Sequence, residues 1–177
     1  KIQASDIQAD DRFGSSVDID GDYAIVGANG EDTGASNVGA AYIFKRTGTA
    51  WAQQAKIQAS DKEQDDKFGA SDWGPTVSIS GNIAVVGAHQ EDTGGANSGA
   101  AYIFERSGTS WTEVKKITAS DAQAADEFGT SVGIDGNNVI VGAYLEDTKG
   151  SNAGAAYIFE RSGTTWTEVE KITASDA

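Results

Sequence analysis

Hydrophobic and polar residues alternate along short segments of this chain, as they do in half-buried β-strands. Residues 15–20 (S-S-V-D-I-D) alternate, residues 23–28 (Y-A-I-V-G-A) and 39–44 (G-A-A-Y-I-F) are mostly apolar, and residues 51–60 are mostly polar. The dipeptide D-G at positions 20–21 is typical of a hairpin closed by a type I′ turn. The pattern predicts four antiparallel strands, with covered central strands and an outer edge strand that carries Lys56.

The whole pattern occurs three times along the chain. The motif K-I-Q-A-S-D or K-I-T-A-S-D begins at residues 1, 56, 116 and 171. The motif F-G begins at Phe13, Phe68 and Phe128, in steps of 55 and 60 residues. We call each such short recurring motif a word. A fixed period of this size indicates a repeat architecture. Four-stranded units in series favour β-propeller blades, and a β-solenoid, whose coils are usually shorter, is the alternative. We expect an all-β fold with an outer strand and lead-in loop over residues 1–12 and blades over residues 13–60, 61–120 and 121–177.

The composition excludes several classes of function. The 177 residues include 27 acidic and 13 basic side chains, for a net charge of −14, and no Cys. Without Cys there are no disulfides and no thiolate chemistry. An acidic chain is unsuited to nucleic acid, because Lys and Arg must neutralise the phosphates. No apolar run approaches the ~20 residues of a membrane span, so no transmembrane segment is expected.

The words F-G, V-G-A and G-A-A-Y-I-F, which first occur at Phe13, Val26 and Gly39, resemble the FG-GAP repeat. This repeat builds the propeller of integrin α subunits and of many secreted bacterial proteins. The resemblance covers nearly the whole chain in three in-phase copies. It implies an extracellular or cell-surface protein that binds other molecules, often proteins or glycans. The Pro of the family's G-A-P is replaced by Asn29, His89 and Tyr144.

Three blades are fewer than the four to eight that usually close a propeller, so we expect an open arc or part of a larger ring. Residues 1–5 then form a spare outer strand. Either neighbouring repeats complete the ring, or copies of the chain assemble head to tail through that strand. The leading interpretation is a non-catalytic extracellular binding or adhesion module. The alternatives are a subunit of a surface filament and an accessory part of a larger secreted enzyme.

Acidic residues of the repeat are candidates for calcium ligands or for side chains that hold turns. The first set, in the D-x-D-G-D hairpin, does not recur with its carboxylates, so we interpret it as a turn. The second set belongs to the recurring word E-D-T, and a third precedes F-G, beginning with Asp6 and Asp11. Oxygen ligands would select calcium, whereas Asp and Asn commonly accept bonds from turn N–H groups. The candidate ligands are Asp18, Asp20, Asp22, Asp32, Asp92 and Asp147.

Catalytic chemistry has little support in the sequence. His89 is the only His and does not recur, and no Ser and Asp are aligned with it as a triad requires. There is no phosphate-binding loop, and abundant carboxylates are a weak signal for glycoside hydrolysis. We therefore expect no enzyme and assign no catalytic residue.

Ligand binding is expected where the three copies differ. Asn29, His89 and Tyr144 occupy the same position after V-G-A, and the second copy carries five extra residues, 71–75, which include Trp73. An exposed Trp is a good anchor for a protein or sugar. The alternatives are neutral variation of an exposed loop and a bulge whose Trp fills a local gap.

Overall fold

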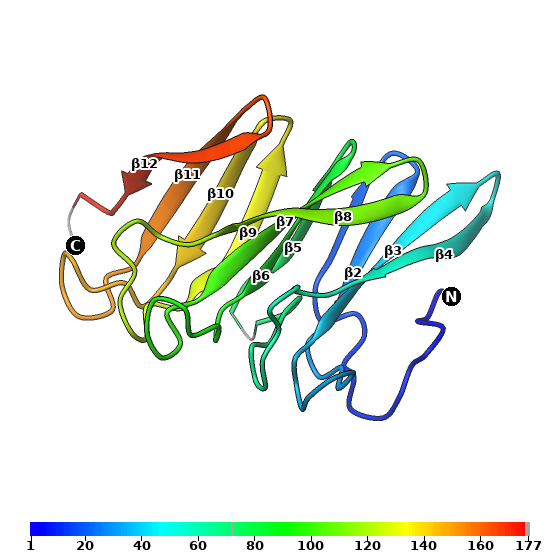
Figure 1. Ribbon diagram of the computed structural model, residues 1–177, viewed down its shortest axis with the longest axis horizontal. Coiled ribbons are helices and arrows are strands. Elements are labelled where there is room, and N and C mark those ends of the chain that lie inside the picture. The colour runs from blue at the N-terminus through cyan, green and yellow to red at the C-terminus, as the bar shows by residue number, and fades with distance from the viewer. Residues whose placement is uncertain (72, 176–177) are drawn as a thin grey trace.

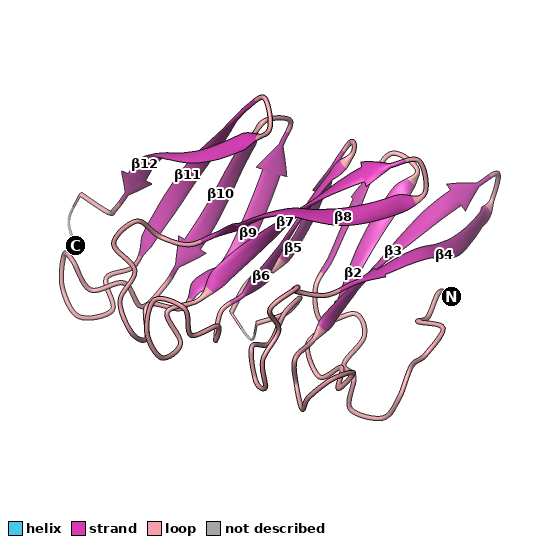
Figure 2. Ribbon diagram, in the orientation of Figure 1, coloured by secondary structure: helices cyan, strands magenta, loops and turns pink. Residues whose placement is uncertain are grey.

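The computed structural model describes residues 1–71 and 73–175, and all regular elements in this part of the chain are β-strands (Figure 1; Figure 2). Blade 1 contains β1 (Val17–Asp20), β2 (Tyr23–Ala28), β3 (Ala40–Thr47) and β4 (Ala50–Ile57). Blade 2 contains β5 (Val77–Ser80), β6 (Ile83–Ala88), β7 (Ala100–Ser107) and β8 (Ser110–Ile117). Blade 3 contains β9 (Phe128–Asp135), β10 (Asn138–Ala143), β11 (Ala155–Ser162) and β12 (Thr165–Ile172). The prediction of an all-β fold with three four-stranded antiparallel blades is confirmed.

Each blade is a meander in which consecutive strands pair antiparallel. Asp20 pairs with Tyr23, so the first hairpin loop consists of Gly21 and Asp22. Gly21 has a φ of 55°, whereas Asp22 is not among the residues with positive φ. A type I′ turn needs positive φ at both loop positions, so the predicted turn type is wrong. Glycine at the first position alone is the pattern of a type II′ turn.

Aromatic residues of the F-G words fill the space between blades. Phe68 is fully buried and packs against Tyr102 and Phe104, with ring centroids 5.6 and 6.0 Å apart. The same cluster includes Ile43 of blade 1, so it joins two blades. Phe128 occupies the equivalent place between blades 2 and 3. These contacts place the hydrophobic core mainly between the sheets, where burial of apolar surface stabilises the stack.

Glycines of the words V-G-A and F-G let neighbouring blades approach backbone to backbone. A Cβ placed on Gly27 would lie 1.7 Å from the carbonyl oxygen of Gly69. A Cβ on Gly87 would lie 2.0 Å from the carbonyl oxygen of Gly129. Neither position has room for a side chain, which explains why both words need glycine.

The three sheets stand side by side in a row and do not close into a ring, with the two ends of the chain at opposite ends of the row (Figure 1). Val17 and Ile19 of β1 are 62% and 61% exposed, whereas their equivalents Val77 and Ile79 are buried against blade 1. At the other end, Ile140 of blade 3 is 45% exposed. Both terminal blades therefore present apolar faces of the type that is covered between blades.

Residues 1–5 differ from the expectation of a spare outer strand. The segment forms no strand; Ala4 is buried, and the Ser5 N–H donates to Oε1 of Gln53 at 2.9 Å. In the inner copies, the Lys-Ile pair of this word ends β4 or β8 and pairs with a strand of its own blade. No strand of the described residues pairs with residues 1–5 in that way. No helix that could cross a membrane is found among the residues that the structure describes.

Candidate functional site

A polar network recurs in every blade and joins words that are distant in the sequence. In blade 2, Lys116 Nζ lies 2.7 Å from Asp61 Oδ2 and 2.7 Å from Glu91 Oε1. Thr93 accepts a third bond from Lys116 and donates its hydroxyl to Glu91. Equivalent networks surround Lys56 and Lys171. The Lys and Asp of K-I-x-A-S-D and the Glu and Thr of E-D-T thus connect the outer strand, the lead-in loop and the loop after V-G-A.

Within the network, the charges of Asp61 and Lys116 stabilise each other. Burial opposes the ionisation of Asp61, but hydrogen bonds from Lys116 and Tyr102 outweigh it and hold the pKa of this carboxyl below its usual range. Burial likewise opposes the charge of Lys116, yet the bonds to Asp61 and Glu91 raise its pKa above the usual range. At neutral pH Asp61 and Lys116 are therefore ionised, and their ion pair links the outer strand of the blade to the lead-in loop.

Asp66, just ahead of the second F-G, is buried, and none of the described residues forms an ion pair with it. Its side chain accepts the backbone N–H of Glu63 at 2.6 Å, and the residue is only 3% exposed. Burial, with a smaller contribution from nearby Glu91, raises the pKa of Asp66 to about 6. Asp11 and Asp126 accept the corresponding backbone bonds in the other two copies.

The Asp of each E-D-T word holds the loop that follows it. Asp32 Oδ1 accepts the backbone N–H of Asn37 at 2.7 Å, and Asn37 has a φ of 51°. The same bond recurs in the other blades, from Asn97 to Asp92 at 2.7 Å and from Asn152 to Asp147 at 2.6 Å. These three carboxylates therefore stabilise turns, as Asp side chains commonly do.

The acidic hairpin of blade 1 faces blade 2 and its own strand β3. Asp18 Oδ2 accepts the Ile79 N–H at 2.8 Å, and Asp20 Oδ2 accepts the Gly81 N–H at 2.7 Å. Asp22 forms ion pairs with Lys45 and Arg46. Among residues 1–71 and 73–175, no three acidic or His side chains are grouped as a metal ion would require. The hairpin carboxylates are engaged in separate contacts and do not fit a shared calcium ion.

The three residues after V-G-A differ in exposure as well as in type. Asn29 is 5% exposed and His89 is 6% exposed, whereas Tyr144 is only half-buried. The first two side chains lie inside the loop ends of blades 1 and 2. Tyr144 alone of the three offers ring surface to a ligand.

The insertion of the second copy reaches across to blade 3. Ser71 Oγ donates to the Thr130 carbonyl at 3.0 Å, and the Pro75 carbonyl accepts the Val132 N–H at 2.8 Å. Between these anchors, Trp73 is 69% exposed and contacts Tyr144, with ring centroids 5.7 Å apart and a tilt of 31°. Asp72 lies outside the described residues. The structure thus brings together two of the four predicted ligand-binding residues, Trp73 and Tyr144.

Glu127 adds a carboxylate beside this aromatic pair. Burial raises the pKa of Glu127, and a hydrogen-bond interaction with the Tyr144 hydroxyl partly offsets the rise. Burial and the same carboxylate raise the pKa of Tyr144. We call Trp73, Tyr144 and Glu127 together the aromatic–acidic site.

The comparison with known families decides the identity of the repeat. The family model described as FG-GAP repeat matches residues 1–44, 51–104 and 111–159. The chain belongs to the FG-GAP repeat family. FG-GAP repeats are typically non-catalytic and usually form binding domains. A search of curated proteins finds no match.

Sequence reasoning missed Glu127 as a member of the site, although a signal was present. The residue before F-G is basic in the first two FG-GAP repeats, Arg12 and Lys67, and acidic only in the third. All three adopt similar positive φ values, 56°, 59° and 54°, whereas the charge at this position is reversed in the third repeat.

Proposed function

We propose that this FG-GAP module is a non-catalytic binding domain of an extracellular or cell-surface protein, and that its ligand contacts the aromatic–acidic site. The observation that carries this proposal is the exposed Trp73 packed against Tyr144: the two residues come from different repeats, and neither aromatic side chain has an equivalent in the other copies. Trp and Tyr are the residues that most often anchor interfaces. Blades 1 and 3 form without an equivalent insertion, so the blade frame does not require this pair.

The proposal is tested by probing protein and glycan arrays with the labelled chain and with a Trp73→Ala, Tyr144→Ala double variant. Val114→Ser is the matched control, because Val114 is 45% exposed on β8 and lies outside the site. We expect the double variant to lose the strongest array signals while Val114→Ser retains them. Signals that survive the double substitution would place binding elsewhere and contradict the proposal.

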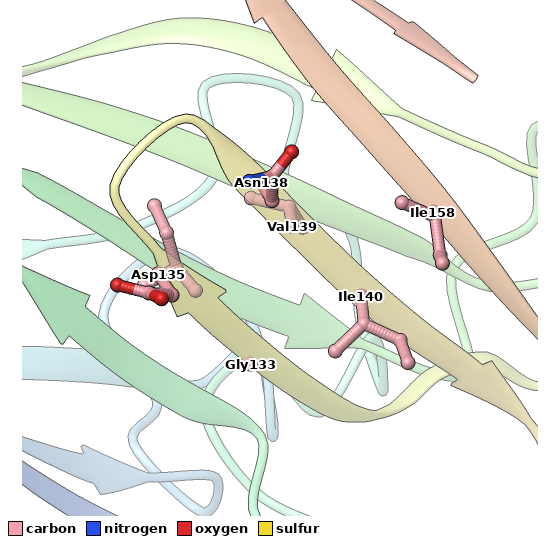
Figure 3. A pocket seen from close by; sticks show the side chains of 7 residues that line it. Gly133, Asp135, Asn138, Val139, Ile140 and Ile158 are labelled. Carbon is pink, nitrogen blue, oxygen red and sulfur yellow. The ribbon is translucent and has the colours of Figure 1, made fainter. Parts of the chain in front are cut away.

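A second candidate function, assembly of chains into a filament or closed array, is favoured by the two apolar end faces. Ile140, Ile158 and Ile172 lie on the outer face of blade 3, and their equivalents in blades 1 and 2 are covered by the next blade. Figure 3 shows Ile140 and Ile158 projecting from neighbouring strands on this face, beside a pocket that includes Gly133. Val17 and Ile19 at the opposite end correspond to the residues that cover such a face between blades 1 and 2.

A second copy of the chain would place its β1 on blade 3 much as β5 lies against blade 1. Such a contact is heterologous, so it generates a ring or an open filament. Light scattering of the purified chain tests this: we expect a mass above 18.3 kDa that Ile140→Lys lowers and Val114→Lys does not. A monomer at high protein concentration would eliminate the second candidate and leave the first untouched.

A further inference from the structure

Nearly all of the Tyr and Trp rings carry a cation from the chain itself. The sequence has four Trp and five Tyr, and seven of these nine rings have a Lys or Arg over them at 4.1 to 6.0 Å. Those seven rings are Tyr23, Tyr42, Trp51, Tyr102, Trp111, Tyr157 and Trp166. Within the described residues, the two rings without such a partner are Trp73 and Tyr144, which contact each other.

The chain also contains a Tyr–Trp pair that carries a cation. Tyr23 and Trp111 come from neighbouring blades, and their ring centroids lie 6.3 Å apart. The Arg106 guanidinium lies 4.4 Å from the Tyr23 centroid and 6.0 Å from the Trp111 centroid. The Trp73–Tyr144 pair has a similar spacing of 5.7 Å and also joins two repeats, although its rings are tilted by 31° instead of 70°. No guanidinium of the described residues lies over it.

The charge beside the empty pair is reversed relative to the other repeats. Where Arg12 and Lys67 stand ahead of F-G, the third repeat has Glu127, with a similar positive φ and with its carboxylate near enough to the Tyr144 hydroxyl to interact with it. Aromatic faces carry partial negative charge, and a carboxylate beside them adds a full one. The whole chain, at −14, attracts positively charged partners further.

We propose that the aromatic–acidic site recognises a positively charged side chain of a partner protein, and specifically the guanidinium of an arginine. This inference rests on the proposed binding function and names the chemical class of its ligand. Arginine fits better than lysine because a planar guanidinium stacks on aromatic faces while it also bonds to a carboxylate. A neutral sugar would use the rings equally well, but it can hydrogen-bond to a basic residue as readily as to a carboxylate, so the change of Arg12 and Lys67 to Glu127 favours a cation more.

The test follows the Trp73 indole N–H resonance of the whole ¹⁵N-labelled chain, which has four such resonances, assigned with Trp73→Phe. The probes are acetyl-Gly-Arg-Gly-amide, the same peptide with uncharged citrulline in place of Arg, and methyl glucoside. We expect the Arg peptide to shift the Trp73 resonance in a saturable way and to bind at least about tenfold more tightly than the citrulline peptide.

Two matched variants separate charge from ring surface. Glu127→Gln should keep the rings in place and lose most of the preference for Arg over citrulline. Glu160→Gln removes one carboxylate from an exposed position of β11 and should leave that preference unchanged. For Trp73→Ala, the backbone amides of residues 127–131 report binding, which should be lost, while an unchanged melting curve shows that the fold is intact.

Three results would overturn the inference. Equal binding of the Arg and citrulline peptides would show that charge is not recognised. A shift by methyl glucoside alone would identify a sugar site, and the proposed binding function would then stand with a different ligand. Binding of the Arg peptide that persists in both Trp73→Ala and Glu127→Gln would place the cation elsewhere on the acidic surface.

Discussion

Replacement of Lys116 by Met tests whether the recurring polar network holds the blades together. Met keeps most of the apolar stem of the side chain and removes the charge. The substitution leaves the Glu91 carboxylate, whose side chain is 10% exposed, with Thr93 but without its cation. It also removes the cation from Asp61, which keeps the Tyr102 hydroxyl and its own backbone N–H as donors. It also removes the ammonium that lies 5.5 Å from the Tyr102 ring centroid.

The expected loss follows from the burial of the two carboxylates. Removal of one partner of a fully buried ion pair costs about 3–5 kcal/mol. Here the Lys116 side chain is 20% exposed and that of Asp61 is 46% exposed, so water can replace part of the interaction, most of all at Asp61. We therefore expect Lys116→Met to lower the free energy of unfolding by about 2–3 kcal/mol.

Urea denaturation at pH 7, followed by circular dichroism, measures this loss as a shift in midpoint at constant slope. Lys115→Met is the matched control, because Lys115 is the neighbouring exposed residue on β8, and it should change stability by less than about 0.5 kcal/mol. The Lys116→Met, Glu91→Gln double variant should be more stable than Lys116→Met alone, since no unpaired buried charge remains. A Lys116→Met variant as stable as Lys115→Met would refute the assignment of a stabilising role to the network.

Three further predictions concern the core, the glycines and the pH dependence. Phe68→Ala should cost about 3–5 kcal/mol and Phe13→Ala clearly less in thermal unfolding, because Phe68 is fully buried and Phe13 is only half-buried. Gly87→Ala should lower the melting temperature more than Gly142→Ala. The new methyl group would lie 2.0 Å from the Gly129 backbone in the first variant, whereas in the second it would meet the Ser131 hydroxyl, which can move. Equal melting temperatures would contradict the close approach of the two backbones. Because the pKa of Asp66 is about 6 when folded and 3.8 is the usual value, the unfolded chain loses this proton first as the pH rises, so stability falls between about pH 4 and 6. Acidification from pH 7 to 5 should therefore raise the free energy of unfolding of the wild type by about 1 kcal/mol relative to Asp66→Asn. The carboxyls with lowered pKa values, Asp6, Asp61 and Asp121, titrate below this pH range. Identical pH profiles of stability for the two proteins would show that Asp66 is not a buried acid.

The strands could be predicted because their signal is local. The apolar segment predicted over residues 23–28 is β2 (Tyr23–Ala28), and the alternating segment over residues 15–20 contains β1 (Val17–Asp20). Alternation and turn residues act on neighbouring positions, which a single copy of the repeat already displays. The turn type was wrong because the D-G signal does not fix the register, and the pairing of Asp20 with Tyr23 moves Gly21 to the first loop position.

The partners of the recurring polar residues could not be predicted, because they depend on contacts between distant segments. Lys116 binds Asp61 and Glu91, which are 55 and 25 residues away. The sequence is compatible with both metal binding and turn formation for the acidic motifs. It gives no sign of the third role, ion pairing with the lysine of the outer strand, because that role depends on which side of the strand faces the loops.

The candidate ligand-binding residues were predicted only in part for the same reason. Variation between copies singled out Asn29, His89 and Tyr144, but it could not indicate that the first two are buried. Nor could it indicate that the insertion folds toward blade 3 and sets Trp73 against Tyr144. The charge reversal at Glu127 was visible in the sequence, and it gained meaning only once the structure placed that residue beside the Tyr144 hydroxyl.

The three copies separate the residues that build this fold from those that are free to bind. Each blade forms the same lysine-centred network, the same F-G contact and the same E-D-T loop, so any residue that a blade requires is present three times. Trp73 and Glu127 have no counterpart of like character in the other copies, and most of the Trp73 side chain faces water. An exposed tryptophan contributes little to a core. The stability of the blades therefore does not account for this pair, whereas the binding of a cationic partner that we propose would account for both residues.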